Sequence, residues 1–285
     1  MKNKNIKKNF LDFGIQKSGK RKIYETLNGD LYDTYMLGRY FKDIFNLDRV
    51  IKRKIKFHKN ILHDIKDLRF NLINFLIILN TKNNKFYEFG FTLYEKIFYF
   101  KFLNSILPVK LDLKKINFCG NDISEKFIFF SENFYKNYKI QLSKNIKKNY
   151  YFGAIFFSKG VTLLYEKKNM IYLTNFVNNC SSGSFDISLY PQKKSMLLET
   201  GYQLYYPSVE EFKNLLKLSN KYFFYRNKKK IGSRIYLEII FGDKYLDKKI
   251  NTALDNLSKN NKIKNYSKYF SLKKKFHLLS FDDFK

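Results

Sequence analysis

A long stretch without helix breakers occupies the first third of this 285-residue chain. No Pro or Gly lies between Gly38 and Gly90, and apolar residues recur three or four positions apart from residue 44 to residue 79. This is the spacing of an amphipathic helix. One straight helix over these residues would be about 54 Å long, whereas a compact domain of this length has a radius of gyration of only about 19 Å. The segment is therefore predicted to form two helices with a bend near residues 58–60.

Short apolar runs separated by polar breaks follow residue 80, and they predict strands. A helix over residues 92–107, stopped by Pro108, interrupts them. Residues 134–149 fit neither pattern, and residues 178–184 are predicted to form a loop. The expected strands cover residues 86–91, 109–118, 126–130, 151–157, 161–165 and 170–177, with a strand pair over 195–206.

The clearest local signal is a capping box formed by Ser208 and Glu211. It predicts a helix to about residue 220, followed by a strand over 233–241 and a last helix over 248–257. The predicted fold class is α+β, with long helical segments in the N-terminal third and a mixed, mostly antiparallel sheet with flanking helices in the remainder. The expected regions are a basic N-terminal extension, a helical region, an α+β domain and a basic C-terminal tail, at residues 1–30, 31–108, 109–259 and 260–285.

Positive charge determines the partners that we expect. The chain has 55 Lys and Arg against 25 Asp and Glu, a net charge of +30, while its 45% hydrophobic content excludes a disordered polycation. Self-repulsion of this size is easiest to tolerate beside a polyanion. Lys greatly outnumbers Arg, and Lys suits phosphate groups better than base edges because it lacks a planar fork. RNA, contacted through its phosphates, is therefore the expected partner.

Three Lys-rich clusters are the candidate RNA-binding sites. They lie on the long helical segment, in a turn before the strand over 233–241, and in the C-terminal tail. Neighbouring aromatic residues such as Phe57, Tyr225 and Tyr266 could stack on unpaired bases. The alternative is a solvated Lys-rich surface with the aromatic rings in the core. The candidate RNA-binding residues are Lys52, Arg53, Lys54, Lys56, Lys59, Arg226, Lys228, Lys229, Lys230, Arg234, Lys273, Lys274 and Lys275.

Patterns typical of a metal site or a catalytic site are missing from the sequence. His58 and His63 are five positions apart and do not share a helix face. Cys119 and Cys180 each stand alone, so neither zinc binding nor thiol catalysis is expected. The carboxylates follow no spacing that separates catalytic groups from surface groups. We therefore expect no catalytic residue, no metal and no cofactor.

Targeting and membrane signals are also missing. The first ten residues are basic without an apolar core, which excludes a secretory signal there. The most apolar run, residues 72–79, is far shorter than the roughly 20 residues of a membrane span. Lys, Asn, Ile, Phe and Tyr dominate while Ala and Pro are scarce, which indicates an A/T-rich gene. We expect a location in the mitochondrial or another organelle matrix, possibly with an organelle-encoded gene; the alternative is cytoplasmic.

Two separate segments carry a family resemblance. Residues 10–19 place Gly14 and Gly19 after an apolar run, and the order from residue 212 to residue 241 is a helix, a strand, the pair Ser233-Arg234 and a final strand. In this the chain resembles the Rossmann-like 2′-O-methyltransferases, which bind S-adenosylmethionine. It departs from them after Gly14, where Ile15, Gln16 and Lys17 replace small residues, and it lacks a catalytic Lys-Asp-Lys-Glu set.

The leading hypothesis is a structural RNA-binding protein, a divergent component of an organellar ribosome that contacts rRNA and neighbouring proteins of the assembly. One alternative is a methyltransferase-like nucleic-acid enzyme or its inactive subunit. Another is an accessory subunit of a different large organellar or viral assembly. A cofactor-shaped cavity would favour the first alternative, and a large exposed apolar patch would favour the second.

Overall fold

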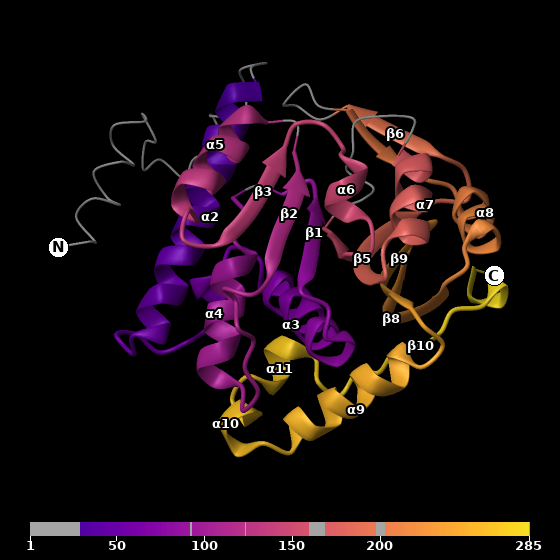
Figure 1. Ribbon diagram of the computed structural model, residues 1–285. Helices are drawn as coiled ribbons and strands as arrows, with labels where there is room; N and C mark the ends of the chain where they lie inside the picture. Colours follow the sequence, from indigo (N-terminus) through magenta and orange to yellow (C-terminus); the bar gives the residue numbers. More distant parts are fainter. Residues whose placement is uncertain (1–28, 92, 123, 160–168, 198–202, 285) are drawn as a thin grey trace.

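An eight-stranded mixed sheet with helices on both faces forms the body of the protein (Figure 1). The computed structural model describes residues 29–91, 93–122, 124–159, 169–197 and 203–284. The strand order is β10-β8-β9-β5-β4-β1-β2-β3. The strands are β1 (Lys85–Phe89), β2 (Asn117–Asn121), β3 (Lys139–Ser143), β4 (Ile155–Ser158), β5 (Ser182–Leu189), β8 (Tyr222–Ile231), β9 (Arg234–Gly242) and β10 (His277–Leu278). A separate hairpin pairs β6 (Lys194–Leu197) with β7 (Gln203–Tyr206).

The sheet has a parallel half and an antiparallel half. Strands β3, β2, β1, β4 and β5 run parallel in that spatial order. Strand β9 is antiparallel to β5, β8 is antiparallel to β9, and β10 adds two residues at the edge. Parallel strands joined through helices, with the order reversing at β1, define a Rossmann-like doubly wound α/β fold.

Helices cover the two faces of the sheet and enclose two separate cores. One core lies under the helices that precede and follow β1 together with those near the C-terminus, and the other lies under the helices around β4 and β5. The first set is α2 (Gly29–Ile51), α3 (Ile65–Thr81), α4 (Lys96–Ile106), α5 (Glu125–Phe134), α9 (Leu246–Ser258), α10 (Asn261–Lys264) and α11 (Ser267–Phe270). The second is α6 (Lys148–Tyr151), α7 (Asn169–Asn179), α8 (Val209–Leu218) and the 3₁₀ turn η4 (Phe281–Phe284).

The predicted break in the N-terminal helical segment is confirmed. Helix α2 ends at Ile51, the turn η2 (Lys59–Ile61) follows, and α3 begins at Ile65. Arg53, two residues after the end of α2, adopts a left-handed backbone conformation. The Asp64 side chain accepts a hydrogen bond from the Lys66 N–H at the start of α3. The two helices therefore have separate ends, and α3 packs on β4 and β5.

The predicted combination of helices with a mixed sheet is confirmed, while several elements differ from expectation. The sequence predicts a mostly antiparallel sheet, and this is wrong for β1 to β5, which pair in parallel. Residues 126–130 and 170–177 belong to α5 and α7 instead of strands, and β3 lies in the stretch that fitted neither pattern. Residues 109–116 precede β2 without forming the predicted strand. The expected strand over 161–165 lies outside the described residues.

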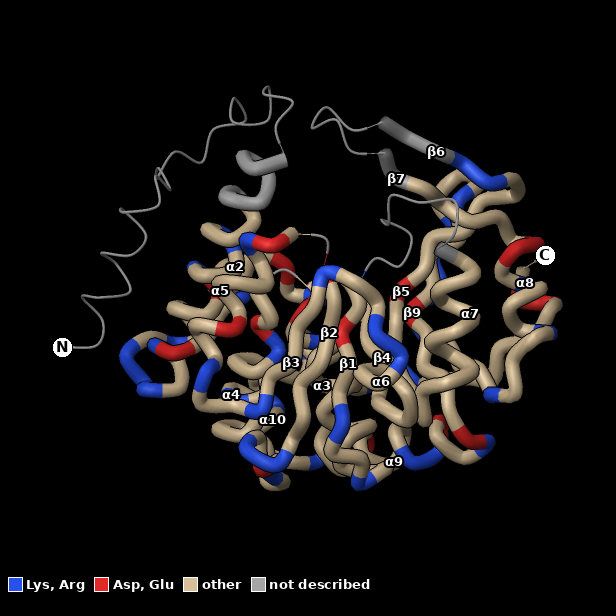
Figure 2. The backbone as a smooth tube through the Cα atoms, turned by 45° about the horizontal axis from the view of Figure 1, so that its top comes forward, with Lys and Arg blue, Asp and Glu red and all other residues tan. Residues whose placement is uncertain are grey.

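Charge is distributed unevenly between the surface and the interior. Figure 2 shows Lys and Arg scattered over many elements, while acidic positions on β1, β5 and β9 lie in the middle of the sheet. Two of these, Glu88 and Glu238, are almost completely buried. Among the described helices, none is both long and apolar enough to cross a membrane.

Candidate functional site

The strand order places a candidate site at the carboxyl ends of β1 and β4. Helix α4, which follows β1, packs in the first core, whereas α7, which follows β4, packs in the second. The chain therefore leaves these two adjacent strands toward opposite faces. Doubly wound proteins bind their ligands in the crevice outside the strand ends at such a switch point.

The turn that follows β1 is filled with large side chains. Gly90 has a left-handed backbone, and its N–H donates to the Asn121 carbonyl at 2.9 Å. Phe91, Leu93 and Tyr94 follow with 0–1% exposure. Tyr94 is also left-handed, with φ of 47°, a strained conformation for a residue other than glycine, and its hydroxyl donates to the Cys119 carbonyl at 2.7 Å.

Strand β2 accommodates this turn through a glycine. A Cβ atom at Gly120 would lie 2.7 Å from the Glu88 carbonyl oxygen, 2.9 Å from the Phe91 ring and 3.1 Å from the Tyr94 ring. The two rings therefore lie directly against the β2 backbone. No space for a side chain remains between the turn and β2.

A buried ion cluster lies beneath the turn. The Lys96 ammonium is 3.1 Å from Glu88 Oε1 and 2.7 Å from Glu95 Oε1, and it lies over the Phe157 ring at 4.8 Å. Lys96 is 1% exposed, and both glutamates are buried. Burial raises the pKa of Glu88 to about 8, although Lys96 opposes this change. Burial alone would lower the pKa of Lys96, but the attraction of Glu88, Glu95 and Asp67 holds it above its usual value.

A second group of charges joins β4 to α3. Lys159, directly after β4, forms ion pairs with Asp67 and, at 3.5 Å, with Asp64. Asp43 of α2 is 1% exposed and accepts a hydrogen bond from the His63 N–H at 2.8 Å. Burial raises the pKa of Asp43 to about 7 despite that hydrogen bond. Perturbed carboxylates at a switch point are typical of functional sites and also of structural ion networks.

A third group links α3 to the C-terminal hairpin. The Glu238 carboxylate on β9 accepts from Arg69 of α3, from Arg226 Nε of β8 at 3.2 Å and from Asn227 Nδ2 at 2.7 Å. Arg226 is 2% exposed and lies over the Phe276 ring at 4.8 Å. Burial, with Arg69 close by, lowers the pKa of Arg226 to about 9. This group connects α3 to β8 and β9.

The cations predicted to bind RNA do not converge on the switch point. Lys52, Arg53, Lys54, Lys56 and Lys59 are exposed in the connection between α2 and α3. Lys273 and Lys274 are exposed, whereas Lys275 pairs with Asp255. Strand β8 continues to Ile231. The exposed Lys228, Lys229 and Lys230 therefore lie on this strand, and the prediction that they lie in a loop is wrong. Arg234 donates to Ser188 Oγ.

Two predictions about individual residues are wrong. Arg226 is buried against Glu238 and cannot reach an external phosphate. The Phe57 ring lies 5.3 Å from the Tyr266 ring and 5.2 Å from the Tyr269 ring, so these rings pack on one another instead of forming a free stacking surface. The glycine-containing segment at residues 10–19 lies outside the described residues.

Sequence reasoning missed the turn that contains Gly90, Phe91, Leu93 and Tyr94. Its signal was present: an apolar strand with the acidic Glu88 inside it, then Gly90, then a helix. A strand–glycine–helix order is the general form of a Rossmann first turn. The large residues after Gly90 concealed it, because the usual fingerprint contains further glycines.

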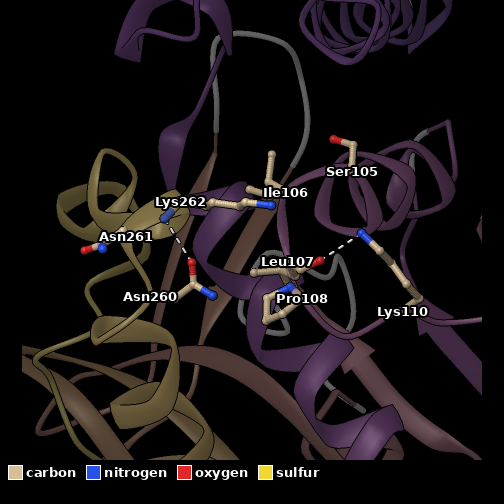
Figure 3. Close-up of a pocket in the computed structure, with 8 residues that line it drawn as sticks. All are labelled: Ser105, Ile106, Leu107, Pro108, Lys110, Asn260, Asn261 and Lys262. Carbon is tan, nitrogen blue, oxygen red and sulfur yellow. Dashed lines mark hydrogen bonds between the residues drawn. The ribbon is translucent and has the colours of Figure 1, made fainter.

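A pocket of about 390 Å³ lies at the other end of α4 (Figure 3). The last turn of α4 and the start of α10 line it, and the Lys110 ammonium donates to the Leu107 carbonyl at its rim. The rise per residue of a helix places it about 15 Å from Lys96, the first residue of α4. It is therefore not part of the crevice at the switch point.

The chain is similar to known proteins in its structure and not in its sequence. No protein-family model and no curated protein matches the chain. The N-terminal domain of EvdMO1, solved with S-adenosylhomocysteine, is similar with a TM-score of 0.45 and 6% identity over 61% of this chain and 81% of that one. An S-adenosylmethionine-dependent methyltransferase from Clostridium acetobutylicum has a TM-score of 0.42 and 10% identity, and the match covers 69% of this chain and 95% of that one. Magnesium protoporphyrin IX methyltransferase from Synechocystis has a TM-score of 0.36 and 11% identity, and the match covers 73% of this chain and 96% of that one.

The strand order gives a doubly wound α/β fold, and the comparison with solved structures corrects the leading hypothesis. The proteins from Clostridium acetobutylicum and Synechocystis are named as methyltransferases, the EvdMO1 domain was solved with S-adenosylhomocysteine, and none of the three is named as a ribosomal protein. The predictions of a ribosomal, rRNA-binding protein with rRNA and a ribosomal assembly as partners are wrong. The methyltransferase-like alternative agrees better with the fold. Its predicted order of helix, strand and final strand corresponds to α8, β8 and β9.

The cofactor that this fold implies does not fit the turn after β1. A nucleotide cofactor of a doubly wound protein needs a small-residue turn that lets the backbone approach it. Here Phe91, Leu93 and Tyr94 are buried in that turn, and two of their rings touch the β2 backbone at Gly120. The helix N-terminus, which would favour a negative group, carries the buried cation Lys96 instead.

Proposed function

We propose that the chain is a methyltransferase-like protein that does not transfer methyl groups, a non-catalytic subunit that retains the fold. One observation carries the proposal: the chain's own side chains Phe91, Leu93 and Tyr94 fill the turn where the cofactor of such a fold would bind. The ion cluster of Glu88, Glu95 and Lys96 directly below supports it, because the chain's own Lys96 forms an ion pair with each glutamate.

The buried contacts of the turn argue against a simple opening that admits a ligand. Tyr94 would have to give up its hydrogen bond to the Cys119 carbonyl and its contact with the Phe91 ring. Phe91 and Tyr94 would also lose their burial, and each fully buried side chain of this kind contributes about 1.5–3 kcal/mol. A bound cofactor would have to compensate for these losses before it showed any affinity.

Cofactor binding by the full chain tests the proposal. Urea unfolding is measured with and without S-adenosylmethionine or S-adenosylhomocysteine at about 1 mM. A ligand with a dissociation constant near 1 μM would stabilise the folded chain by about 4 kcal/mol under these conditions. We expect no shift in the unfolding midpoint, while a known methyltransferase measured in parallel shifts. A saturable shift in this chain would overturn the proposal.

A further inference from the structure

Lys96 lies in a place that opposes a positive charge. It is 1% exposed and is the first residue of α4. Lys is almost never fully buried unless it is paired, and the N-terminal end of a helix carries a partial positive charge that favours anions. Both effects work against an ammonium group here. Specific partners must therefore hold it.

Three groups from different parts of the fold surround this ammonium. Glu88 comes from the carboxyl end of β1, Glu95 precedes α4, and Phe157 comes from β4. Their contacts with Lys96 Nζ are 3.1 Å, 2.7 Å and, to the ring centre, 4.8 Å. Carboxylates together with an aromatic face are the groups that bind organic cations. The side chains thus form a cage for a primary ammonium group.

The cage places two carboxyl groups around the single ammonium of Lys96. The second carboxylate oxygens, Glu88 Oε2 and Glu95 Oε2, are buried without a hydrogen-bond partner among the described residues. Buried carboxylates need a compensating charge or a proton. Removal of the Lys96 side chain would therefore leave two buried carboxyl groups without their cation at the carboxyl end of β1, where ligands of this fold bind.

We infer that Lys96 acts as an internal ligand: its ammonium group occupies a cation site built by Glu88, Glu95 and Phe157, and a small alkylammonium ion can replace it when the side chain is shortened. The inference rests on the proposed function in one respect, namely that the chain's own side chains occupy the space at the carboxyl ends of β1 and β4. It names the class of ligand that the site accepts, a primary ammonium on a short apolar chain.

Chemical rescue of Lys96→Ala tests this inference. The substitution removes three carbons and the nitrogen, the atoms that n-propylammonium supplies. Thermal unfolding is followed during titration with n-propylammonium chloride. We expect a saturable rise in the melting temperature of roughly 3 °C or more, with no comparable rise for wild type. Sodium chloride at the same concentration controls for ionic strength.

Lys101→Ala is the matched control variant. Lys101 lies on the same helix over the Phe98 ring at 4.5 Å and the Tyr138 ring at 5.1 Å, without a carboxylate partner among the described residues. The inference is overturned if propylammonium stabilises Lys96→Ala no more than sodium chloride does, or no more than it stabilises Lys101→Ala.

A second pair of variants decides the matter if Lys96→Ala does not fold. Lys96→Met keeps most of the side-chain volume but leaves the carboxylates unpaired, and Lys96→Met/Glu88→Gln removes one of those charges. We expect the double variant to be more stable than Lys96→Met alone, and an equal or lower stability would overturn the cation site. Cofactor binding by wild type would overturn the proposed function and leave the amine rescue as a separate result.

Discussion

At the residue scale, buried charges distinguish this protein more than any sequence motif does. Lys96, Asp67, Glu88 and Glu238 are each at most 2% exposed, and each lies within an ion pair. Residues of these types are rarely buried without a partner. The sequence could not identify them, because each stands in a locally ordinary context and the partners of Asp67 and Glu238 are distant along the chain. Arg69 and Glu238, for example, are 169 positions apart.

Asp43 provides the pH dependence that belongs to this scale. Burial raises its pKa from 3.8 to about 7 in the folded chain. An acid with a higher pKa in the folded state binds protons preferentially there, so stability falls as the pH rises from about 4 to about 7. Asp43→Asn removes this titration. Its stability relative to wild type should grow with pH by up to about 1.4 kcal/mol per pH unit.

Urea unfolding of both proteins at several pH values in that window provides the measurement. Asp112→Asn, at an exposed position, controls for the loss of a carboxylate as such. If Asp43→Asn runs parallel to wild type across the window, the aspartate is ionised in the folded chain and the raised pKa is wrong.

At the element scale, the sequence indicates some boundaries well and others poorly. The capping box at Ser208 and the break between α2 and α3 were predictable because both depend on local chemistry. The sequence predicts strands where α5 and α7 form, because Phe, Ile and Tyr in short runs fit both structures. A signal for α5 was present, since Ser124 accepts a hydrogen bond from the Phe127 N–H as its N-cap. The parallel order of β1 to β5 depends on long-range packing that no local pattern encodes.

The capping box of α8 leads to a prediction at this scale. Ser208 Oγ accepts from the Glu211 N–H at 3.0 Å, and Glu211 Oε2 accepts from the Ser208 N–H at 2.8 Å. Ser208→Ala removes the first bond and should lower the free energy of unfolding by about 1 kcal/mol. Ser208→Asp retains a capping oxygen and should remain close to wild type. Equal losses in the two variants, measured by urea unfolding, would mean that the cap does not contribute.

At the scale of the whole molecule, the Arg69–Glu238–Arg226 group connects α3 to the C-terminal hairpin. Glu238→Gln removes the negative charge and leaves two guanidinium groups facing a neutral amide. Loss of one partner from a buried ion pair costs about 3–5 kcal/mol, and we expect a loss of this order in the free energy of unfolding. Amide hydrogen exchange should then increase in both α3 and β8, although these elements are distant in sequence.

The surface pair Lys144–Glu125 provides the comparison for that prediction. Its atoms are 2.8 Å apart, and both side chains are largely exposed. Surface pairs contribute little to stability, so Lys144→Gln should leave the urea midpoint and the exchange of α3 and β8 almost unchanged. Local exchange confined to β9 in Glu238→Gln would show that the group does not connect the two halves.

The net charge of +30 affects the stability of the molecule as a whole. Lys and Arg are spread over many elements in Figure 2, so the folded chain brings like charges closer together than the unfolded chain does. Such self-repulsion destabilises a compact state. Salt screens exposed charges over a Debye length of about 10 Å at 0.1 M, whereas buried pairs are screened much less. Added salt should therefore weaken the repulsion and leave the buried groups intact.

We accordingly expect the urea midpoint to rise between about 0.02 M and about 0.5 M KCl, with an unchanged dependence of the unfolding free energy on urea concentration. Sucrose at matched osmolality controls for effects unrelated to charge. Replacing several exposed lysines of the connection between α2 and α3, such as Lys54, Lys56 and Lys59, by Gln should reduce the salt effect. A midpoint that falls with added KCl would mean that exposed ion pairs outweigh the repulsion, so the excess positive charge would carry no net cost to folding.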